Sequence, residues 1–186
     1  MTLDAFGTLV ELVDPVPPLQ AALAKRGIER SAEEVGAAFR AEVEHYVPRS
    51  HLGPLDRLRC ECVGVFLRAA DARLDVEEFV APFVEALVFR PLPGVVEALA
   101  RLRARGLALA VVSNWDESLR EKLPPLGIDV VVSSAEVGAP KPDPAIFRVA
   151  LERLGVTASR ALHIGDSASD EAGARAAGMR FRWAPL

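Results

Sequence analysis

The second half of the chain alternates short apolar runs with helical segments, and this alternation restricts the possible folds more than any other feature. From Pro91 onward, four runs are typical of strands: Leu107–Val112, Val130–Ser133, Ala161–Ile164 and Arg180–Trp183. Between them the sequence predicts helices that follow Pro93, over Glu117–Leu123, from Pro144 to Gly155 and over Glu171–Ala177. Strands that alternate with helices form right-handed crossovers and lie parallel. The sequence therefore predicts an α/β fold with a parallel sheet buried on both faces.

Residues that start and stop helices support this assignment. Asp116 and Asp143 are expected to cap helix amino termini, because a short acidic side chain accepts hydrogen bonds from the free amides there. Gly106, Gly155 and Gly178 stand where a left-handed residue closes each helix. The predicted boundaries thus follow from residues whose backbone preferences are known.

Residues 14–90 follow a different pattern, because they contain helix-like segments with no strand-like run between them. The segments are Leu19–Lys25, Ala32–Val47, Leu55–Ala70 and Val76–Leu87. Glycine, proline and aspartate supply breaks between them. We therefore expect an α/β core formed by residues 1–13 and 91–186, with a helical domain, residues 14–90, inserted into it.

Composition narrows the classes of partner. The net charge of −4, with 26% charged residues, gives no basic surface for nucleic acid or an anionic membrane. No apolar run reaches the roughly 18 residues of a membrane span, and the amino terminus does not resemble a secretory signal, so we expect a cytoplasmic protein. Cys60 and Cys62 lie at no zinc-ligand spacing from the histidines. A small-molecule substrate is the expected partner.

Polar side chains follow the predicted strands at the points where they end. Only three residues precede Asp4, so the first strand is expected to be short. Ligands of open parallel sheets bind beyond the carboxyl ends of the strands. We therefore expect one site to contain Asp4, Ser113, Asn114, Lys141, Asp166 and Asp170. His163, between apolar neighbours on a strand, is expected to be an interior residue and not a base.

Each of these residue types has a chemical role in displacing a phosphoryl group or another leaving group from an acidic small molecule. A carboxylate such as Asp4 can attack and form a covalent intermediate. Asp4 and Asp166 together can hold Mg²⁺, which prefers carboxylate oxygens. Lys141 and the Ser113–Asn114 pair can bind the substrate, with the ammonium and the hydroxyl on phosphoryl oxygens. Asp170 is better suited to orient Lys141 or a metal-bound water than to react.

Four motifs resemble those of the haloacid dehalogenase superfamily, in the same order and at strand ends. They are Asp4–Leu9, Val111–Asn114, Gly138–Pro144 and Gly165–Asp170. An insert directly after the first motif resembles the subfamily with a helical cap. The resemblance covers about residues 1–13 and 91–183. It implies a Rossmann-like hydrolase core with an inserted helical cap, and a Mg²⁺ site to which Phe6 contributes its backbone carbonyl.

Phe6 departs from the pattern of the superfamily's phosphatases. They usually carry a second aspartate two residues after the nucleophile, which protonates the leaving group and later activates water. A phenyl ring can do neither, so phosphatase activity should lose the roughly 10²–10⁴-fold that general acid–base catalysis provides. The leading hypothesis is a Mg²⁺-dependent phosphatase of a small phosphorylated metabolite, slow on generic substrates, that forms an aspartyl-phosphate at Asp4.

Two alternatives remain open at this stage. The superfamily's 2-haloacid dehalogenases have D-A-Y-G-T-L where this chain has D-A-F-G-T-L, but they need no metal, whereas Asp166 and Asp170 are similar to the metal-binding version. A non-catalytic member that binds a phosphorylated ligand or a protein is the second. Substrate selectivity is expected from polar or aromatic residues of the inserted domain, with Arg40, His45, Tyr46, Arg49 and His51 as candidates.

Overall fold

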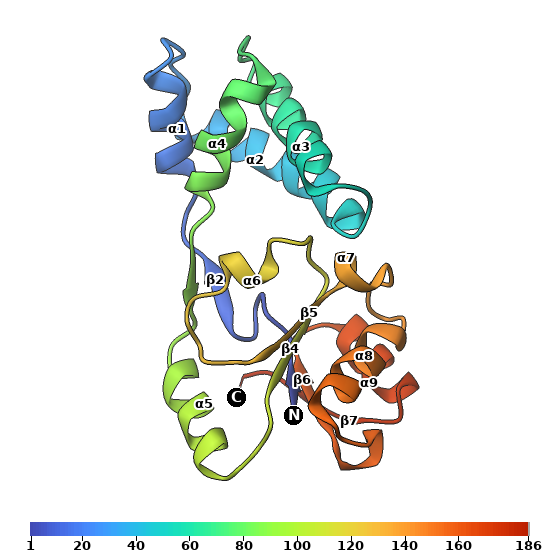
Figure 1. The fold of residues 1–186 in the computed structure, drawn as a ribbon. Helices are drawn as coiled ribbons and strands as arrows, with labels where there is room; N and C mark the ends of the chain where they lie inside the picture. Colours follow the sequence, from blue (N-terminus) through green and yellow to red (C-terminus); the bar gives the residue numbers. More distant parts are fainter. Residues whose placement is uncertain (186) are drawn as a thin grey trace. The chain divides into compact units, whose positions relative to one another are not determined.

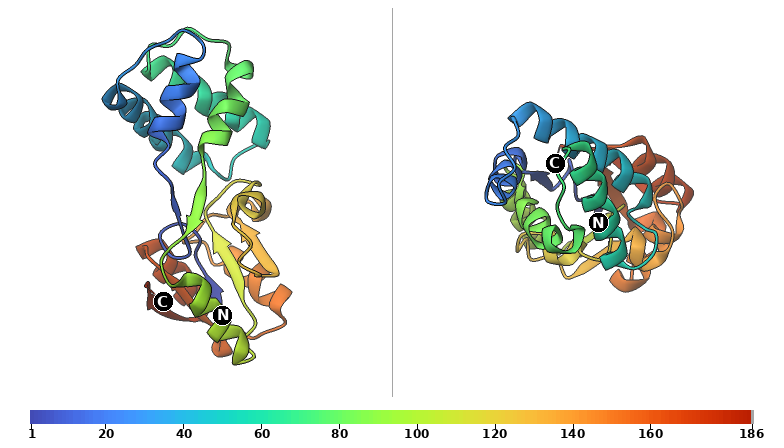
Figure 2. Two further views of the ribbon diagram at one scale, coloured as in Figure 1. Left: turned by 90° about the vertical axis from the view of Figure 1, so that its left-hand side faces the viewer. Right: turned by 90° about the horizontal axis from the view of Figure 1, so that it is seen from above.

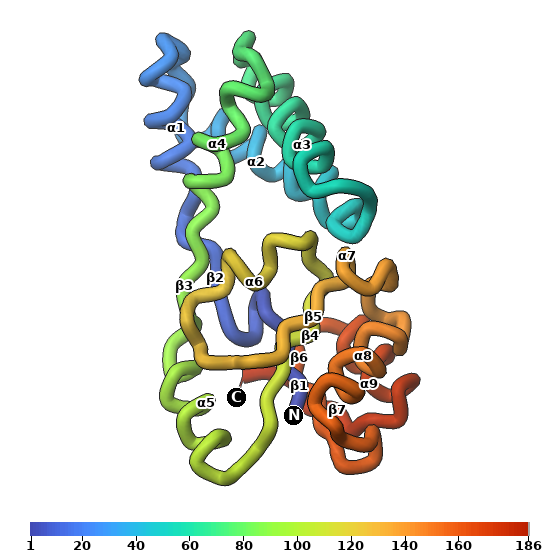
Figure 3. The backbone as a smooth tube through the Cα atoms, viewed as in Figure 1, coloured from blue at the N-terminus to red at the C-terminus, as the bar shows by residue number. Residues whose placement is uncertain are grey.

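The computed structural model describes residues 1–185, and the chain divides into two compact units. We call Met1–Glu11 together with the chain from Phe89 onward the core unit, and Leu12–Val88 the cap unit. Figure 3 allows the chain to be followed out of the core unit through β2 (Val10–Leu12) and back through β3 (Phe89–Pro91). These two strands form a small sheet of their own, which the sequence pattern did not predict.

The core unit is built on a five-stranded sheet with the order β5-β4-β1-β6-β7, and its neighbouring strands are all parallel. This confirms the predicted α/β class. The central strand is β1 and it is short, as expected, with only two residues. The strands are β1 (Thr2–Leu3), β4 (Ala110–Ser113), β5 (Val130–Ser133), β6 (Leu162–Gly165) and β7 (Arg180–Trp183).

Helices cover both faces of this sheet, as Figure 1 shows, with α5 (Val95–Ala104) on one side and α8 (Ala145–Leu154) and α9 (Ala168–Ala176) on the other. Successive strand residues point to opposite faces. Val111 accordingly belongs to the apolar cluster on the α5 side, whereas Ala110 and Val112 belong to the cluster on the other side. Both faces are therefore apolar, which explains why the strands are apolar runs without polar alternation.

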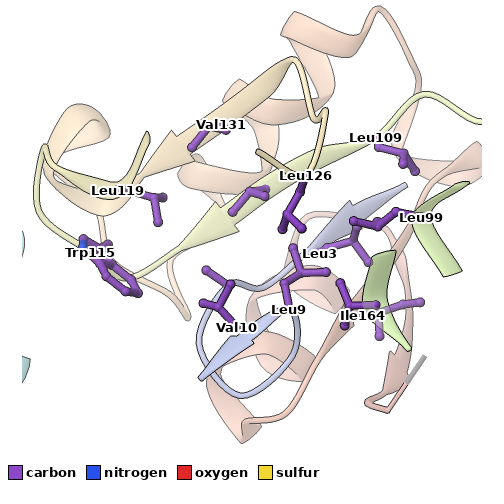
Figure 4. Packing of buried hydrophobic residues seen from close by; sticks show 13 residues of the cluster. Leu3, Leu9, Val10, Leu99, Leu109, Trp115, Leu119, Leu126, Val131 and Ile164 are labelled. Carbon is purple, nitrogen blue, oxygen red and sulfur yellow. The ribbon is translucent and has the colours of Figure 1, made fainter. Parts of the chain in front are cut away.

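The cluster on the α5 side holds the central strand in place. Figure 4 shows Leu3 of β1 in one cluster with Leu99 of α5, Ile164 of β6 and, beyond β4, Val131 of β5. Leu3 is completely buried and Leu99 is almost completely buried. Burying one such side chain stabilises a fold by about 1.5–3 kcal/mol, so packing compensates for the few ladder hydrogen bonds that a two-residue strand can make.

Side-chain hydrogen bonds shift several helix boundaries from the predicted ones. The last helix begins at Ala168 and not at Glu171, because Ser167 and Asp170 form a reciprocal cap in which each side chain accepts from the other's backbone amide. Asp116 caps no helix. It accepts instead from the Ser118 amide at 2.7 Å, and α6 spans only Leu119–Lys122.

Three further differences concern short segments. The strand predicted from Leu107 begins only at Ala110. Asp143 accepts from the amide of Ala145 at 2.8 Å, but Pro144 occupies the cap position of α8. A four-residue helix that the sequence did not predict, α7 (Ser134–Val137), follows β5 directly. The apolar pattern thus located the longer elements without fixing their exact ends, and it missed this short helix.

The cap unit is a group of helices, drawn from further directions in Figure 2: α1 (Val16–Ala24), α2 (Ala32–Tyr46), α3 (Leu55–Ala69) and α4 (Val76–Ala86), with a 3₁₀ turn at Val47–Arg49. Its core contains stacked aromatic rings. The centroids of Phe66 and Phe79 lie 6.0 Å apart, and Phe66 also contacts Phe83 at 5.2 Å. Ser31 and Glu34 cap α2 reciprocally. Among residues 1–185, no helix is long and apolar enough to cross a bilayer.

Candidate active site

The sequence-predicted site residues meet at the ends of β1, β4 and β6, which we call the carboxyl edge of the sheet. Asp4 follows β1 directly, and its backbone amide donates to the carbonyl of Ile164 in β6 at 2.9 Å. Ser113 is the last residue of β4, and Asp166 follows β6. The parallel register of β1 with both neighbours brings these three positions to one edge.

Lys141 lies in a buried ion-pair network between two carboxylates. Its Nζ is 2.6 Å from Asp4 Oδ1 and 2.5 Å from Asp170 Oδ1, and Ser113 Oγ donates to the same Asp4 oxygen at 2.9 Å. The three charged side chains are at most 8% exposed. Burial by itself lowers the pKa of Lys141, but the charges of Asp4 and Asp170 and the hydrogen bonds to them raise it above its usual range. The lysine is therefore a fixed positive charge.

Asn114 holds the loop that carries Lys141. Its side-chain Oδ1 accepts from the Lys141 amide at 2.7 Å, and its Nδ2 donates to the Lys141 carbonyl at 3.0 Å. Both polar ends of the amide are thus engaged with one backbone residue. The sequence predicts Asn114 as a substrate-binding residue; the structure shows that its side chain also positions the backbone of Lys141.

Two further residues, His163 and Ser167, hold Asp170, and Thr2 in turn holds His163. No role in the site was predicted from the sequence for Thr2 or Ser167. His163 Nε2 lies 3.0 Å from Asp170 Oδ1, and His163 Nδ1 lies 2.8 Å from Thr2 Oγ1. Ser167 Oγ donates to Asp170 Oδ2 at 2.5 Å. The S-x-x-D spacing of Ser167 and Asp170 was the available signal for this cap, whereas no sequence pattern connects Thr2 with His163.

These bonds determine the charge of Asp170. Burial alone would raise the pKa of its carboxyl group, but the hydrogen bond from His163, the charge and hydrogen bond of Lys141 and the bond from Ser167 together lower it well below its usual range. Asp170 is therefore a carboxylate. His163 is completely buried, as expected of an interior residue, and it contacts the site only through Asp170.

Three acidic groups converge at the carboxyl edge. Carboxylate oxygens of Asp4, Asp166 and Asp170 lie within 4.8 Å of one another. Burial, followed by the charges of Asp4 and Asp170, raises the pKa of Asp166. Like charges this close favour a cation among them, and oxygen donors suit Mg²⁺. Both Asp170 oxygens already accept hydrogen bonds, so the donor set that fits the ion is Asp4 with Asp166.

The loop after Asp4 approaches Asp166 closely because it contains glycine. Gly7 has φ +80°, and a Cβ atom there would overlap the Asp166 carboxylate. The same two residues help to line a hollow of about 300 Å³, together with Thr8 and the start of α5. Phe6 is 52% exposed, which is unusual for a phenyl ring beside buried polar groups.

Comparison with known proteins assigns this chain to a family. The model of the haloacid dehalogenase-like hydrolases matches residues 1–178. The chain belongs to the haloacid dehalogenase-like hydrolases. Among its relatives, haloacid dehalogenase-like hydrolase domain-containing protein 3 of Bos taurus is 34% identical over 197 residues, which are 96% of this chain and 78% of the relative.

Two further similarities bear on activity and fold. A phosphoserine phosphatase of Thermus thermophilus is 46% identical over 100 residues, which are 50% of this chain but only 40% of that enzyme. A solved HAD phosphatase from Thermococcus onnurineus is 27% identical with a TM-score of 0.62, covering 98% of this chain and 84% of that one. A defluorinating L-2-haloacid dehalogenase superposes with a TM-score of 0.78 over 97% of this chain and 78% of that one, at 21% identity, and so shows the shared fold.

Proposed function

We propose that this haloacid dehalogenase-like hydrolase is a Mg²⁺-dependent phosphatase of a small phosphorylated metabolite, with Asp4 as the nucleophile. The observation that carries the proposal is the convergence of the Asp4, Asp166 and Asp170 carboxylates within 4.8 Å, with Lys141 Nζ 2.6 Å from Asp4. An aspartate nucleophile needs a cation beside it when it attacks an anionic phosphoryl group. The buried Lys141 supplies one positive charge beside Asp4, and the three clustered acids would hold a second one, a metal ion.

Each residue then has a defined role. Asp4 attacks phosphorus through a carboxylate oxygen and forms an aspartyl-phosphate. Asp4, Asp166 and the backbone carbonyl of Phe6 would hold Mg²⁺, which when bound neutralises phosphoryl charge. Lys141 Nζ and Ser113 Oγ both reach Asp4 Oδ1, so a phosphoryl group on Asp4 would lie within range of both donors. Asp170 keeps Lys141 charged and oriented.

The phosphatase names among the relatives support this reaction class. A phosphoserine phosphatase, a phosphoglycolate phosphatase and glyceraldehyde 3-phosphate phosphatases are among the proteins with similar sequence. Their names denote small phosphorylated substrates, and we propose the same class for this chain. Those alignments cover only about half of the chain, so a particular substrate is not transferred from them.

Dehalogenation is a second candidate because of Phe6. A halide leaves without a proton, so an exposed phenyl ring two residues after the nucleophile does not impede that reaction. A metal-free dehalogenase, however, has no use for the Asp166 carboxylate close to Asp4. This candidate predicts metal-independent halide release from 2-chloropropionate that Asp4→Asn abolishes; no release would remove it.

Turnover of p-nitrophenyl phosphate with Mg²⁺, and with EDTA in its place, tests the phosphatase. We expect Mg²⁺-dependent release of phosphate by the wild type and none by Asp4→Asn, because an amide cannot act as the nucleophile. The matched control is Asp129→Asn, which makes the same change at an exposed position of the core unit and should keep full activity. Equal activity in wild type and Asp4→Asn, or activity unaffected by EDTA, would contradict the proposal.

A further inference from the structure

The ionisable groups that contact one another at the carboxyl edge are already committed to other roles. Lys141 Nζ lies between Asp4 and Asp170, and its side chain is 3% exposed. Both ring nitrogens of His163 are engaged, one with Thr2 and one with Asp170, and the ring is completely buried. None of these groups extends to solvent, where the leaving group of a substrate would depart.

The remaining carboxylates of the site are equally committed. Both oxygens of Asp170 accept hydrogen bonds, and its side chain is 0% exposed. Asp166, which is exposed, is a ligand in the proposed Mg²⁺ site, and a carboxylate bound to a cation carries no proton to donate. Within the core unit as described, the network around Asp4 thus holds a nucleophile, a fixed cation and metal ligands, and no titratable group that is free to donate a proton.

Phe6 is the solvent-facing side chain of the loop that begins at Asp4. Its side chain is 52% exposed and therefore not packed into the core, and its backbone forms a bridge with Val10. A phenyl ring exchanges no proton. Phe6, the first exposed residue after the nucleophile, can therefore neither donate nor accept a proton.

We propose that Phe6 makes this site selective for phosphoryl donors whose leaving group departs as a stable anion, namely acyl phosphates and activated aryl phosphates, over alkyl phosphates. This inference rests on the proposed phosphatase function. In the first step an Asp4 oxygen forms a bond to phosphorus while the bond from phosphorus to the leaving oxygen breaks. The electron pair stays on that oxygen, which leaves as a carboxylate or aryloxide without taking up a proton.

The second step, hydrolysis of the aspartyl-phosphate, also lacks a side chain that takes part in proton transfer. A water oxygen bonds to phosphorus, the bond from phosphorus to Asp4 breaks, and the water proton passes to the released phosphate or to solvent. Without a side chain to accept that proton, hydrolysis of the aspartyl-phosphate is slow. The phosphorylated enzyme consequently accumulates with a good donor, and release of the leaving group shows a burst.

The test measures phosphorylation of the enzyme by acetyl phosphate, p-nitrophenyl phosphate, phenyl phosphate and ethyl phosphate. Enzyme in excess is mixed with each donor and Mg²⁺, quenched in acid, and assayed for protein-bound phosphate in wild type, Phe6→Asp and Phe6→Asn. Asparagine matches aspartate in size but cannot transfer a proton, so it is the control for changes of shape. Because the Phe6 side chain is exposed, we expect all three proteins to fold alike, and circular dichroism checks this.

We expect wild-type and Phe6→Asn rates to fall steeply from acetyl phosphate to ethyl phosphate. Phe6→Asp should raise the rate with ethyl phosphate by about 10²–10⁴-fold and change that with acetyl phosphate little, because only the poor leaving group needs a proton. In a separate measurement with p-nitrophenyl phosphate in excess over enzyme, the burst of leaving-group release should also disappear in Phe6→Asp. A wild type that uses ethyl phosphate as fast as p-nitrophenyl phosphate would overturn the inference while leaving the phosphatase proposal intact.

Two other outcomes are also decisive. If Phe6→Asp and Phe6→Asn show the same dependence on the leaving group, position 6 does not control selectivity and the inference is wrong. If no donor phosphorylates any of the three proteins, the proposed function fails and the inference fails with it.

Discussion

Replacing Lys141 with methionine tests whether the buried charge network is organised as described. Methionine keeps the length and apolar stem of the side chain but removes the ammonium group. Asp4 and Asp170 would then be buried carboxylates without their cation, 8% and 0% exposed. The change therefore converts a balanced network into an excess of negative charge at the carboxyl edge.

The expected magnitude follows from this burial. Exposed ion pairs contribute about 0–1 kcal/mol, whereas removing one partner of a buried pair costs about 3–5 kcal/mol. The low exposure of all three side chains places Lys141 in the second class. For a chain of this size, each kcal/mol lowers the melting temperature by about 2–4 °C, so Lys141→Met should melt about 6–20 °C below the wild type.

The pH dependence provides an independent check. The folded pKa of Asp170 lies below its unfolded value, so the stability it contributes is present above about pH 4 and is lost only as the pH falls through the folded pKa. The folded pKa of Lys141 is raised, so its contribution persists until alkaline pH. In Lys141→Met the pKa of Asp170 should be higher than in the wild type, because the charge and the hydrogen bond of Lys141 both lower it there, so protonation should relieve part of the excess negative charge. The difference between variant and wild type should therefore shrink from pH 7 to pH 4.

Tryptophan fluorescence reports on the unfolding of the core unit, which contains Lys141. Both tryptophans, Trp115 and Trp183, lie in the core unit. Unfolding would be followed in EDTA, since bound Mg²⁺ would stabilise the folded variant. Arg105→Met, which also replaces a cation with methionine but at an exposed position of the core unit, is the control and should melt with the wild type. A Lys141→Met protein as stable as that control, or one whose deficit grows on acidification, would refute the account of the network.

Two further predictions concern a glycine and a buried acid. Gly7→Ala should weaken Mg²⁺ binding at least about ten-fold by calorimetry, a loss of about 1.4 kcal/mol, because its Cβ would displace Asp166. Gly106→Ala has a similar φ of +72° but open space, so it should lose stability and keep the affinity; equal affinities in the two variants would contradict this. Burial raises the pKa of Glu42 to about 7 despite a hydrogen bond from Cys62, so wild-type stability should fall by roughly 3 kcal/mol as the pH rises from 4.5 to beyond 7. Glu42→Gln should abolish that fall in urea unfolding followed by circular dichroism, and an unchanged pH profile would refute the assignment.

Local pattern accounts for the parts of the fold that could be predicted. Short apolar runs located the five strands of the core sheet, because a parallel sheet is buried on both faces, and helical periodicity located the helices of the cap unit. Element ends were less predictable. Asp116 and Asp143 each accept from an amide two residues further on, where a helix cap was expected, and only the local backbone conformation decides between these partners.

The sequence alone determined which candidate chemistry the chain carries, since Asp4 and Asp166 directly follow strands, Lys141 lies beyond β5, and parallel strands end at one edge. The tertiary structure decided how that chemistry is held. Thr2 and His163 form a hydrogen bond although they are 161 positions apart in the sequence, and the Asn114 side chain binds the backbone of Lys141, 27 positions away. Such contacts depend on strand register and loop path, which no local signal encodes, and the pKa values of Asp166 and Asp170 follow from those contacts because burial and neighbouring charge exist only in the folded chain.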